Sequence, residues 1–269
     1  MTHPPKPVGL EPEPVGRHPE LVEGQATPRV LVFAGLDSSG RAGLLADGQA
    51  VLASGARPVL CATAIAAQSS SRLVRMEPVS AAAVQAQAQA ALEDGPIAAV
   101  KVGMVGSKEI HRTLLALFEG PLARAAIVVD PVFQTSRGGA LFDGTAAEWS
   151  PLMAPATLVT PNLAEAAALT GLPCAGEAQM AEAARRLVAL GARAVLLKGG
   201  HLEGNPADLL WASGAPSWMR GERIPGARRG TGCRLASAIA ARLALGARLE
   251  EAVPQGVEWL RSWMRSGGG

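Results

Sequence analysis

Short apolar runs alternate along this chain with longer stretches in which apolar residues recur at helical spacing. Six runs are continuous, as is typical of strands covered on both faces. They are residues 30–34, 59–64, 98–102, 126–129, 157–159 and 194–197. Parallel strands need crossover connections of the kind that lie between these runs. The rhythm therefore predicts an α/β fold, with a mostly parallel central sheet and helices on both faces.

Capping residues indicate where the helices begin and end. Ser80 and Ser107 each precede a helical pattern, and Gly191 follows one in the position that stops a helix. The helices that follow Ser80 and Ser107 are expected to end near residues 92 and 117. Three further helices are expected over residues 177–190, 234–245 and 249–264. Two stretches after Lys198, residues 208–211 and 217–224, have the texture of short antiparallel edge strands.

Both ends of the chain lack a hydrophobic period. Six of the 20 prolines fall between Pro4 and Pro19, and the chain ends in three glycines. Segments of this composition bury too little apolar surface to offset the entropy of ordering them. We predict a disordered Pro-rich extension over residues 1–27, one domain over residues 28–265 and a flexible tail over residues 266–269.

Composition and net charge narrow the kinds of molecule that this protein is expected to bind. The 269 residues are 48% hydrophobic and 18% charged, which suits a globular core, and the net charge of +2 gives no general attraction to nucleic acid or to a membrane. Three scattered cysteines predict neither disulfides nor a metal site. No signal peptide or membrane span is apparent. We expect a cytoplasmic protein that binds small molecules, and a homodimer stays open.

Polar clusters follow almost every apolar run. Gly, Asp, Asn, Lys or Pro residues stand where a plain turn does not require them, after residues 34, 100, 129, 159 and 197. In an open parallel sheet the carboxyl ends of the strands share one edge, and ligands bind there. These clusters are therefore expected to converge on one cleft.

The segment Gly230-Thr231-Gly232-Cys233 opens an apolar helical pattern. Glycines let backbone amides turn inward, and the amino terminus of a helix adds positive charge, so the segment predicts an anion cradle suited to a transferring phosphoryl group. The helix dipole and Arg228 or Arg229 would favour the Cys233 thiolate, which accepts a hydroxyl proton. The alternative is a glycine-rich cap beside a small buried cysteine.

The chain has only four lysines but 21 arginines, so a lysine at a strand end is notable. Lys198 is placed to reach nucleotide phosphates, with a solvated turn lysine as the alternative, whereas Lys101 is interpreted as structural. Asn162 and Glu165 are spaced to hold the hydration shell of Mg²⁺, or to form a capping box. Asp130 fits either an Mg²⁺ site or an ordinary turn.

Two further positions fit a substrate. Asp37 could accept hydrogen bonds from a polar ligand or close an Asx turn, and Met104 could line an apolar wall or fill the core. Two common phosphate-binding signatures are missing: the P-loop pattern is absent, and Gly35, Gly40 and Gly43 lack the Rossmann spacing.

Together these motifs resemble the ribokinase-like superfamily, and within it the hydroxymethylpyrimidine and phosphomethylpyrimidine kinases of thiamine biosynthesis. The resemblance covers residues 29–264 and rests on six ordered motifs. They are AGLDSSGRAG at 34–43, KVGM at 101–104, DPVF at 130–133, TPNLAEA at 160–166, KGGH at 198–201 and RGTGC at 229–233. It implies a ribokinase-like three-layer sandwich that uses ATP and Mg²⁺ to phosphorylate a pyrimidine alcohol and then its monophosphate.

The resemblance also implies roles for residues. Cys233 would be the base that activates the substrate hydroxymethyl group, with Gly230, Thr231 and Gly232 as the anion hole. ATP contacts are implied for Lys198, Asn162, Thr160 and Arg229, substrate contacts for Gly35, Asp37, Leu45, Met104 and Val132, and Mg²⁺ contacts for Glu165 and Asp130.

Four positions depart from the family pattern. Arg41 stands for a glycine and Leu45 for a glutamine that reads the aminopyrimidine, while Arg229 and Arg234 replace a histidine and a threonine. A lost hydrogen-bond partner in a buried site costs on the order of 1–3 kcal/mol. Two alternatives therefore stay open: a pyridoxal or related vitamin kinase, and a catalytically weak pyrimidine-binding protein.

Overall fold

The computed structural model describes residues 26–69, 71–134, 139–226 and 229–267. Nine strands in these ranges form one sheet: β1 (Arg29–Asp37), β2 (Arg57–Gln68), β3 (Leu73–Pro78), β4 (Ala99–Val102), β5 (Ala126–Val129), β6 (Leu158–Val159), β7 (Val195–Leu197), β8 (Ala207–Ala212) and β9 (Ala215–Arg220). The predicted extension lies outside the described residues up to position 25, as do residues 268 and 269 of the predicted tail.

The described helices alternate with the strands. They are α1 (Gly43–Ala53), α2 (Ala81–Glu93), α3 (Lys108–Glu119), α4 (Ala146–Trp149), α5 (Leu163–Thr170), α6 (Glu177–Ala189), α7 (Thr231–Ala244) and α8 (Leu249–Arg265), with a 3-10 turn η1 (Ser150–Met153). Within the ranges given above, no helix is long and apolar enough to cross a membrane.

The sheet order is β3-β2-β1-β4-β5-β6-β7-β8-β9. The strands from β2 to β7 in this order pair in parallel, whereas β3 at one edge and β8 and β9 at the other pair antiparallel. All six predicted parallel strands and the edge hairpin are confirmed. The last predicted strand is shifted, since β9 ends at Arg220 rather than at residue 224. Strand β3 was not predicted.

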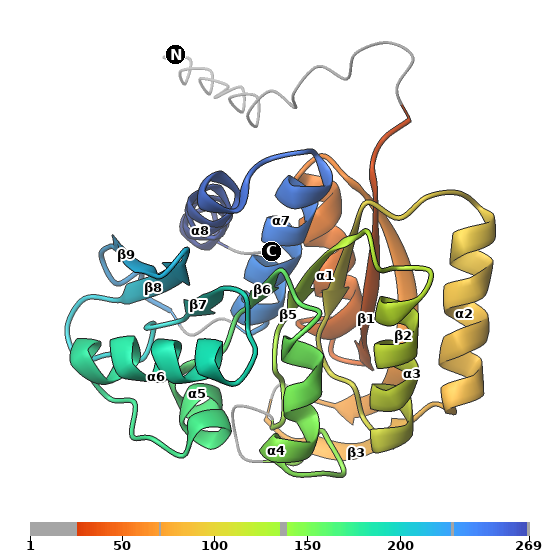
Figure 1. The fold of residues 1–269 in the computed structure, drawn as a ribbon, viewed down its shortest axis with the longest axis horizontal. Coiled ribbons are helices and arrows are strands. Elements are labelled where there is room, and N and C mark those ends of the chain that lie inside the picture. Colours follow the sequence, from red (N-terminus) through yellow and green to blue (C-terminus); the bar gives the residue numbers. More distant parts are fainter. Residues whose placement is uncertain (1–25, 70, 135–138, 227–228, 268–269) are drawn as a thin grey trace, which may run out of the picture.

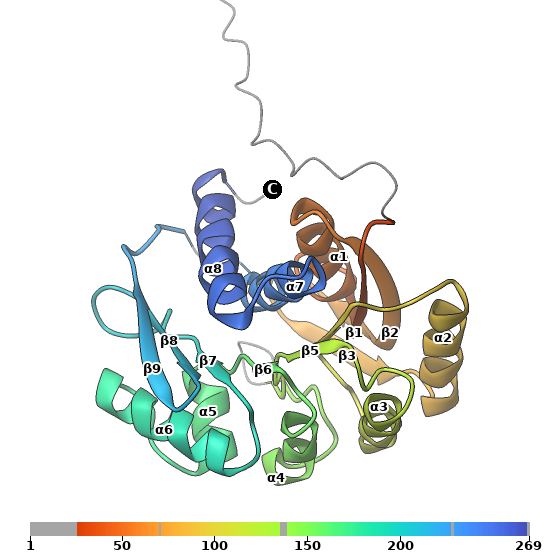
Figure 2. The same cartoon turned by 45° about the horizontal axis from the view of Figure 1, so that its top comes forward.

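Helices cover both faces of the sheet, so the predicted three-layer α/β architecture is confirmed (Figures 1 and 2). Helices α1, α7 and α8 lie on one face, and α2 to α6 lie on the other. Strand β1 shows the pattern: Val30 and Val32 belong to the core under α1 and α7, while Leu31 and Phe33 belong to the core under α2 and α3. Both sides of the strand are buried, which explains its unbroken apolar run.

The predicted helix signals are found in the structure. The Ser80 hydroxyl accepts from the Ala83 amide, and the Ser107 hydroxyl accepts from the Ile110 amide. Helix α7 begins at Thr231, three residues earlier than expected, because Gly230 adopts the left-handed conformation (φ +73°) and caps it. This earlier start brings the whole Thr231-Gly232-Cys233 segment into the first helical turn.

Candidate active site

The carboxyl ends of the parallel strands meet at one edge, and a pocket lies there. It is lined by Ala34, Gly35, Asp37, Ala42, Gly43, Ala66, Gln68, Lys101, Met104, Val132, Leu141 and Cys233. The structure thus brings together four predicted substrate contacts, Gly35, Asp37, Met104 and Val132, with the predicted base Cys233.

Leu45 does not join this pocket. It is 48% exposed on α1, beside Gly40, because the helical period turns Leu44 and Asp47 inward instead. A leucine at this position therefore removes no hydrogen-bond partner from the pocket. The amide side chain that does line it is Gln68, which the sequence analysis missed. Its position as the last residue of β2, at the same sheet edge, was the available signal.

The loop after β1 is folded tightly against the strand. Asp37 accepts hydrogen bonds from the Ser39 amide and hydroxyl, both at 2.9 Å, so the expected Asx turn is present while Asp37 also lines the pocket. A side chain on Gly43 would overlap the carbonyl oxygen of Gly35, and one on Gly35 would overlap the Met104 side chain. Glycine is required at Gly43, where the obstacle is backbone and φ is +61°, for the loop to approach the strand.

The amino terminus of α7 forms the opposite wall. A side chain on Gly230 would overlap the Arg41 carbonyl oxygen, so a glycine lets this turn lie directly against the first loop. A Cβ on Gly232 would stand 3.0 Å from Lys198 Nζ and 3.7 Å from Asp130 Oδ2. The predicted cradle therefore lies beside the predicted phosphate-binding lysine, and its first-turn amides are free of intrahelical partners.

The charges around Cys233 differ from those expected. Burial raises the pKa of its thiol to about 11, while Lys101 and the Gly43 amide act in the opposite direction. Arg228 lies outside the described residues, and Arg229 donates to the Ser69 carbonyl oxygen at 2.8 Å. The cation that favours the thiolate is thus Lys101, which the sequence analysis interpreted as structural.

Lys198 and Asp130 form an ion pair at the ends of β7 and β5. Lys198 Nζ donates to Asp130 Oδ1 at 2.6 Å, and the buried Thr160 hydroxyl donates to the same oxygen at 3.1 Å. Burial lowers the pKa of Lys198, but Asp130 and Glu165 outweigh it, so the pKa is raised and the ammonium stays charged. Three predicted ATP and metal residues are therefore in direct contact.

Asn162 and Glu165 form the capping box that was weighed against an Mg²⁺ site. Glu165 Oε2 accepts from the Asn162 amide at 2.8 Å, and Asn162 Oδ1 accepts from the Glu165 amide at 2.9 Å. Burial raises the pKa of Glu165 to about 7, against the opposing effect of Lys198. Glu165 thus has a local structural role and also faces the Lys198–Asp130 pair.

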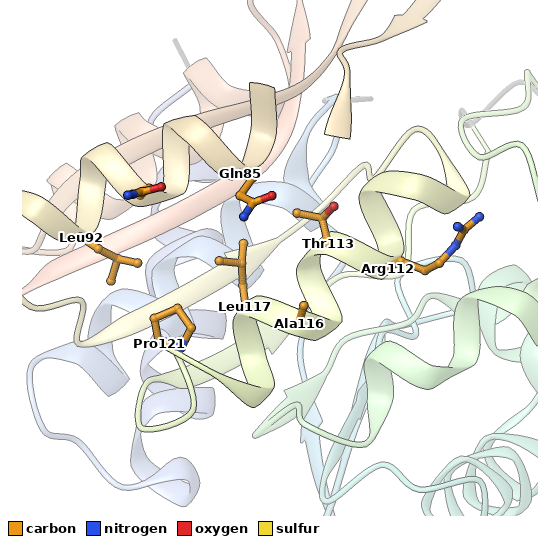
Figure 3. A pocket seen from close by; sticks show the side chains of 8 residues that line it. Gln85, Leu92, Arg112, Thr113, Ala116, Leu117 and Pro121 are labelled. Carbon is orange, nitrogen blue, oxygen red and sulfur yellow. The ribbon is translucent and has the colours of Figure 1, made fainter. Parts of the chain in front are cut away.

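A larger hollow lies elsewhere, between α2 and α3 (Figure 3). It has a volume of about 560 Å³ and is lined by Gln85, Gln89, Leu92, Arg112, Thr113, Ala116, Leu117 and Pro121. These side chains include no base, thiol or carboxylate, and the helices that carry them lie on the face away from α7. We therefore place the chemistry at the smaller pocket, where titratable groups converge.

Sequence comparison identifies the family of this chain. The family model for phosphomethylpyrimidine kinase matches residues 37–268. A hydroxymethylpyrimidine/phosphomethylpyrimidine kinase of Streptomyces coelicolor is 39% identical, over 89% of this chain and 90% of its own length. One from Rhizobium meliloti is 42% identical, over 88% of this chain and 90% of its own length.

Solved structures are similar over the same range. A phosphomethylpyrimidine kinase from Clostridium difficile is 32% identical, with a TM-score of 0.75 over 87% of this chain and 98% of that one. A Staphylococcus aureus pyridoxal kinase in complex with AMP-PCP and pyridoxal is 30% identical, with a TM-score of 0.80 over 88% of both chains. With the fold, the cradle and the cysteine in place, the chain belongs to the phosphomethylpyrimidine kinase family.

Proposed function

We propose that this protein transfers the terminal phosphoryl group of ATP to hydroxymethylpyrimidine and then to its monophosphate, in thiamine biosynthesis. The observation that carries the proposal is the position of Cys233, which lines the pocket from the first turn of α7, next to the cradle and to Lys198. A proton acceptor, an anion cradle and a cation that can bind the phosphates are the groups that phosphoryl transfer to an alcohol requires.

Each group has one task. The Cys233 thiolate accepts the proton of the substrate hydroxyl, whose oxygen then attacks phosphorus while the bond to the ADP oxygen breaks. Backbone amides of the first α7 turn, Thr231 to Cys233, stabilise charge on the phosphoryl oxygens. Lys198 binds the phosphates by leaving Asp130, a change open to it because its side chain is 15% exposed.

In this proposal, Asp130 and Glu165 are the residues that would hold Mg²⁺. Both carboxylates face Lys198, and oxygen ligands are those that Mg²⁺ prefers. Among the residues that the structure describes, no three His, Cys, Asp or Glu side chains form a metal-binding cluster. The residues therefore fit an ion shared with phosphate oxygens and water rather than a cage made of protein alone. The ion would neutralise phosphate charge.

Recognition of the pyrimidine ring is proposed for the side of the pocket away from α7. The Gln68 amide offers both a donor and an acceptor, which suits the paired ring nitrogen and amino group of an aminopyrimidine. Met104 and Val132 supply apolar contact to the ring. Among the described residues, Gln68 is hydrogen-bonded to Ser38 through its backbone, and its side-chain amide is available to a ligand.

Pyridoxal phosphorylation is the second candidate. The supporting observation is that the Staphylococcus aureus pyridoxal kinases superimpose with TM-scores of 0.80 and 0.81, against 0.75 for the Clostridium difficile phosphomethylpyrimidine kinase. A pyridine carrying a hydroxymethyl group would present the same hydroxyl to Cys233. A catalytically weak pyrimidine-binding protein is the third candidate, which the test must distinguish from the two kinases.

The test is a substrate panel with a matched cysteine control. ADP release is measured with hydroxymethylpyrimidine, its monophosphate and pyridoxal, for the parent protein, Cys233→Ala and Cys174→Ala. We expect turnover of the two pyrimidines, a loss of at least 100-fold in kcat for Cys233→Ala and no loss for Cys174→Ala. Turnover of pyridoxal alone would replace the first proposal with the second. Pyrimidine binding without ADP release would leave the third.

A further inference from the structure

We propose that Lys101 is a positioning residue for this reaction: fixed by Asp47, it holds a positive charge beneath Cys233 and allows the sulfur to carry the negative charge of a base. This inference rests on the proposed role of Cys233. It gives a function to a lysine whose position in the middle of a strand otherwise suggests a purely structural part.

The first step is the position of Lys101 in β4. Val100 and Val102 face the core under α2 and α3, and Ala99 faces the core under α1 and α7. Alternation along the strand places Lys101 on the same side as Ala99. Its side chain has no exposed area at all, although the neighbours on that face are aliphatic. A charge at such a position needs a reason, because burying it is costly.

The second step is the way this charge is held. Lys101 Nζ donates to Asp47 Oδ2 at 2.8 Å, and the Ser237 hydroxyl donates to Asp47 Oδ1 at 2.8 Å. Asp47 and Ser237 are fully buried as well. Burial lowers the pKa of Lys101, but Asp47, Cys233 and Asp130 together outweigh it and keep the amine protonated. The three groups tie β4, α1 and α7 together and fix the ammonium in one place.

The third step is the relation of this cluster to Cys233. Ser237 lies four residues after Cys233 on α7, and Asp47 lies four residues after Gly43 on α1. The Gly43 amide donates to the Cys233 sulfur. Residues four apart stand one above the other on a helix. The same two helices therefore hold Cys233 at the pocket and the Lys101 anchor one turn below it, and Lys101 and Cys233 line the same pocket.

The fourth step compares the other charges that face the sulfur. Asp47 on α1 and Asp130 at the end of β5 both oppose the thiolate. Lys198 is engaged by Asp130. Arg234, next to Cys233 on α7, stacks on the Trp263 ring at 4.4 Å and donates to the Arg41 carbonyl oxygen at 2.9 Å. Lys198 and Arg234 also interact with the charge of Cys233, but Lys101 is the cation that does most to offset the burial that raises the pKa of the thiol.

The experiment measures the thiol directly. The rate of alkylation by iodoacetamide is followed against pH in the full chain carrying Cys174→Ser, since Cys174 is the other partly exposed thiol of the described residues. Removing a nearby opposite charge shifts a pKa by about one to three units. We expect Lys101→Met to raise the pKa of Cys233 by about one unit or more, and Asp47→Asn to lower it. A merely structural pair would not give opposite shifts.

A second comparison covers the case in which Lys101→Met fails to fold because Asp47 is left unpaired. The double variant Lys101→Met/Asp47→Asn buries no unpaired carboxylate, and relative to Asp47→Asn alone its thiol pKa should again rise by about one unit. Lys198→Met is the matched control, because it removes a strand-end lysine that is paired with Asp130 and whose charge acts on the thiol less strongly than that of Lys101, and its shift should be smaller.

The outcomes separate this inference from the proposed function. If Lys101→Met folds and its alkylation profile matches that of the parent, the inference is wrong, whatever the turnover. The same holds if the double variant and Asp47→Asn titrate alike. If the profiles shift as expected but no pyrimidine is phosphorylated, the placement of the charge stands and the proposed substrate is wrong.

Discussion

Two lysine–aspartate pairs flank the first turn of α7, and they differ in access to solvent. In the pair at β4, Lys101 and Asp47 both have 0% exposed side chains. In the pair at the end of β7, Lys198 is 15% exposed and Asp130 is 2% exposed. Each lysine follows an apolar strand run, and each contacts a carboxylate at hydrogen-bond distance. The sequence pattern around the two is nearly the same.

The difference in exposure gives the two lysine–aspartate pairs different functions. A pair without solvent access has no other partner to exchange with, so its charges are fixed in place and act only through space. A pair with one open side can release its lysine to a phosphate, because water and ligand can take over the contact with the carboxylate. The enclosed pair can therefore tune the cysteine, while the open pair can bind what enters the cleft.

Breaking the enclosed pair should have the largest effect on folding. Lys101→Met leaves Asp47 as an unpaired buried carboxylate, and we expect the free energy of unfolding to fall by about 3–5 kcal/mol. Urea denaturation followed by circular dichroism measures the change. The control is Lys108→Met, which breaks the exposed pair with Glu148 and should cost less than about 1 kcal/mol. Equal losses in the two variants would contradict the comparison.

Breaking the open pair should affect turnover more than folding. Lys198→Met removes a donor from the phosphate site, and kcat should fall by about 100- to 1000-fold, as when one donor to developing charge is lost. Asp130 keeps the hydrogen bond from Thr160, and water can take the place of the partly exposed Lys198, so the protein should stay folded. Steady-state ADP release together with a thermal melt tests both halves. A folded variant with parent turnover would show that Lys198 binds no phosphate.

The pH dependence of the free energy of unfolding should report on Glu165, which faces the open Lys198–Asp130 pair. Its pKa is raised from 4.5 to about 7 in the folded protein. The folded state therefore holds this proton where the unfolded chain has released it. Stability falls as pH rises from about 4.5 to about 7, by on the order of 2 kcal/mol. Unfolding measured across this interval should show a shallower slope for Glu165→Gln, and identical slopes would contradict the assignment.

Removing the enclosed pair altogether should have the smallest effect. Buried ion pairs replaced by apolar side chains of similar size are often neutral for stability. We expect Lys101→Met/Asp47→Leu to unfold within about 1 kcal/mol of the parent in urea, although Lys101→Met alone is strongly destabilised. A double variant as unstable as the single one would indicate that the pair itself holds β4 and α1 together.

The apolar runs predicted the parallel strands because most of them, such as β1, are buried on both faces, which leaves a simple mark in the sequence. Strand β3 left no such mark. Its residues Leu73–Pro78 are mostly exposed at the sheet edge, with polar and apolar side chains in no clear alternation. Helix caps such as Ser80 were predictable because their partners lie within three residues.

Site prediction was limited by long-range contacts. The motif order placed Cys233, Lys198 and Asp130 at one sheet edge, and the structure brings them together. The structural interpretation of Lys101 agrees with its buried ion pair, but the partner Asp47 was not predictable because it is 54 residues away and belongs to no motif. Leu45 was assigned to the substrate because it stands where the family pattern has a glutamine that reads the aminopyrimidine, although the turn of α1 directs it to solvent. Sequence spacing alone does not determine which side of a helix faces a ligand.

The anchor of Lys101 lies in a strand and two helices, whereas the groups proposed to recognise the ring lie at strand ends and in loops. The parts of the chain that decide which vitamin precursor fits can therefore diverge without disturbing the group that removes its proton. Such a division would let related kinases change substrate in few mutations while their reactive centre is inherited intact.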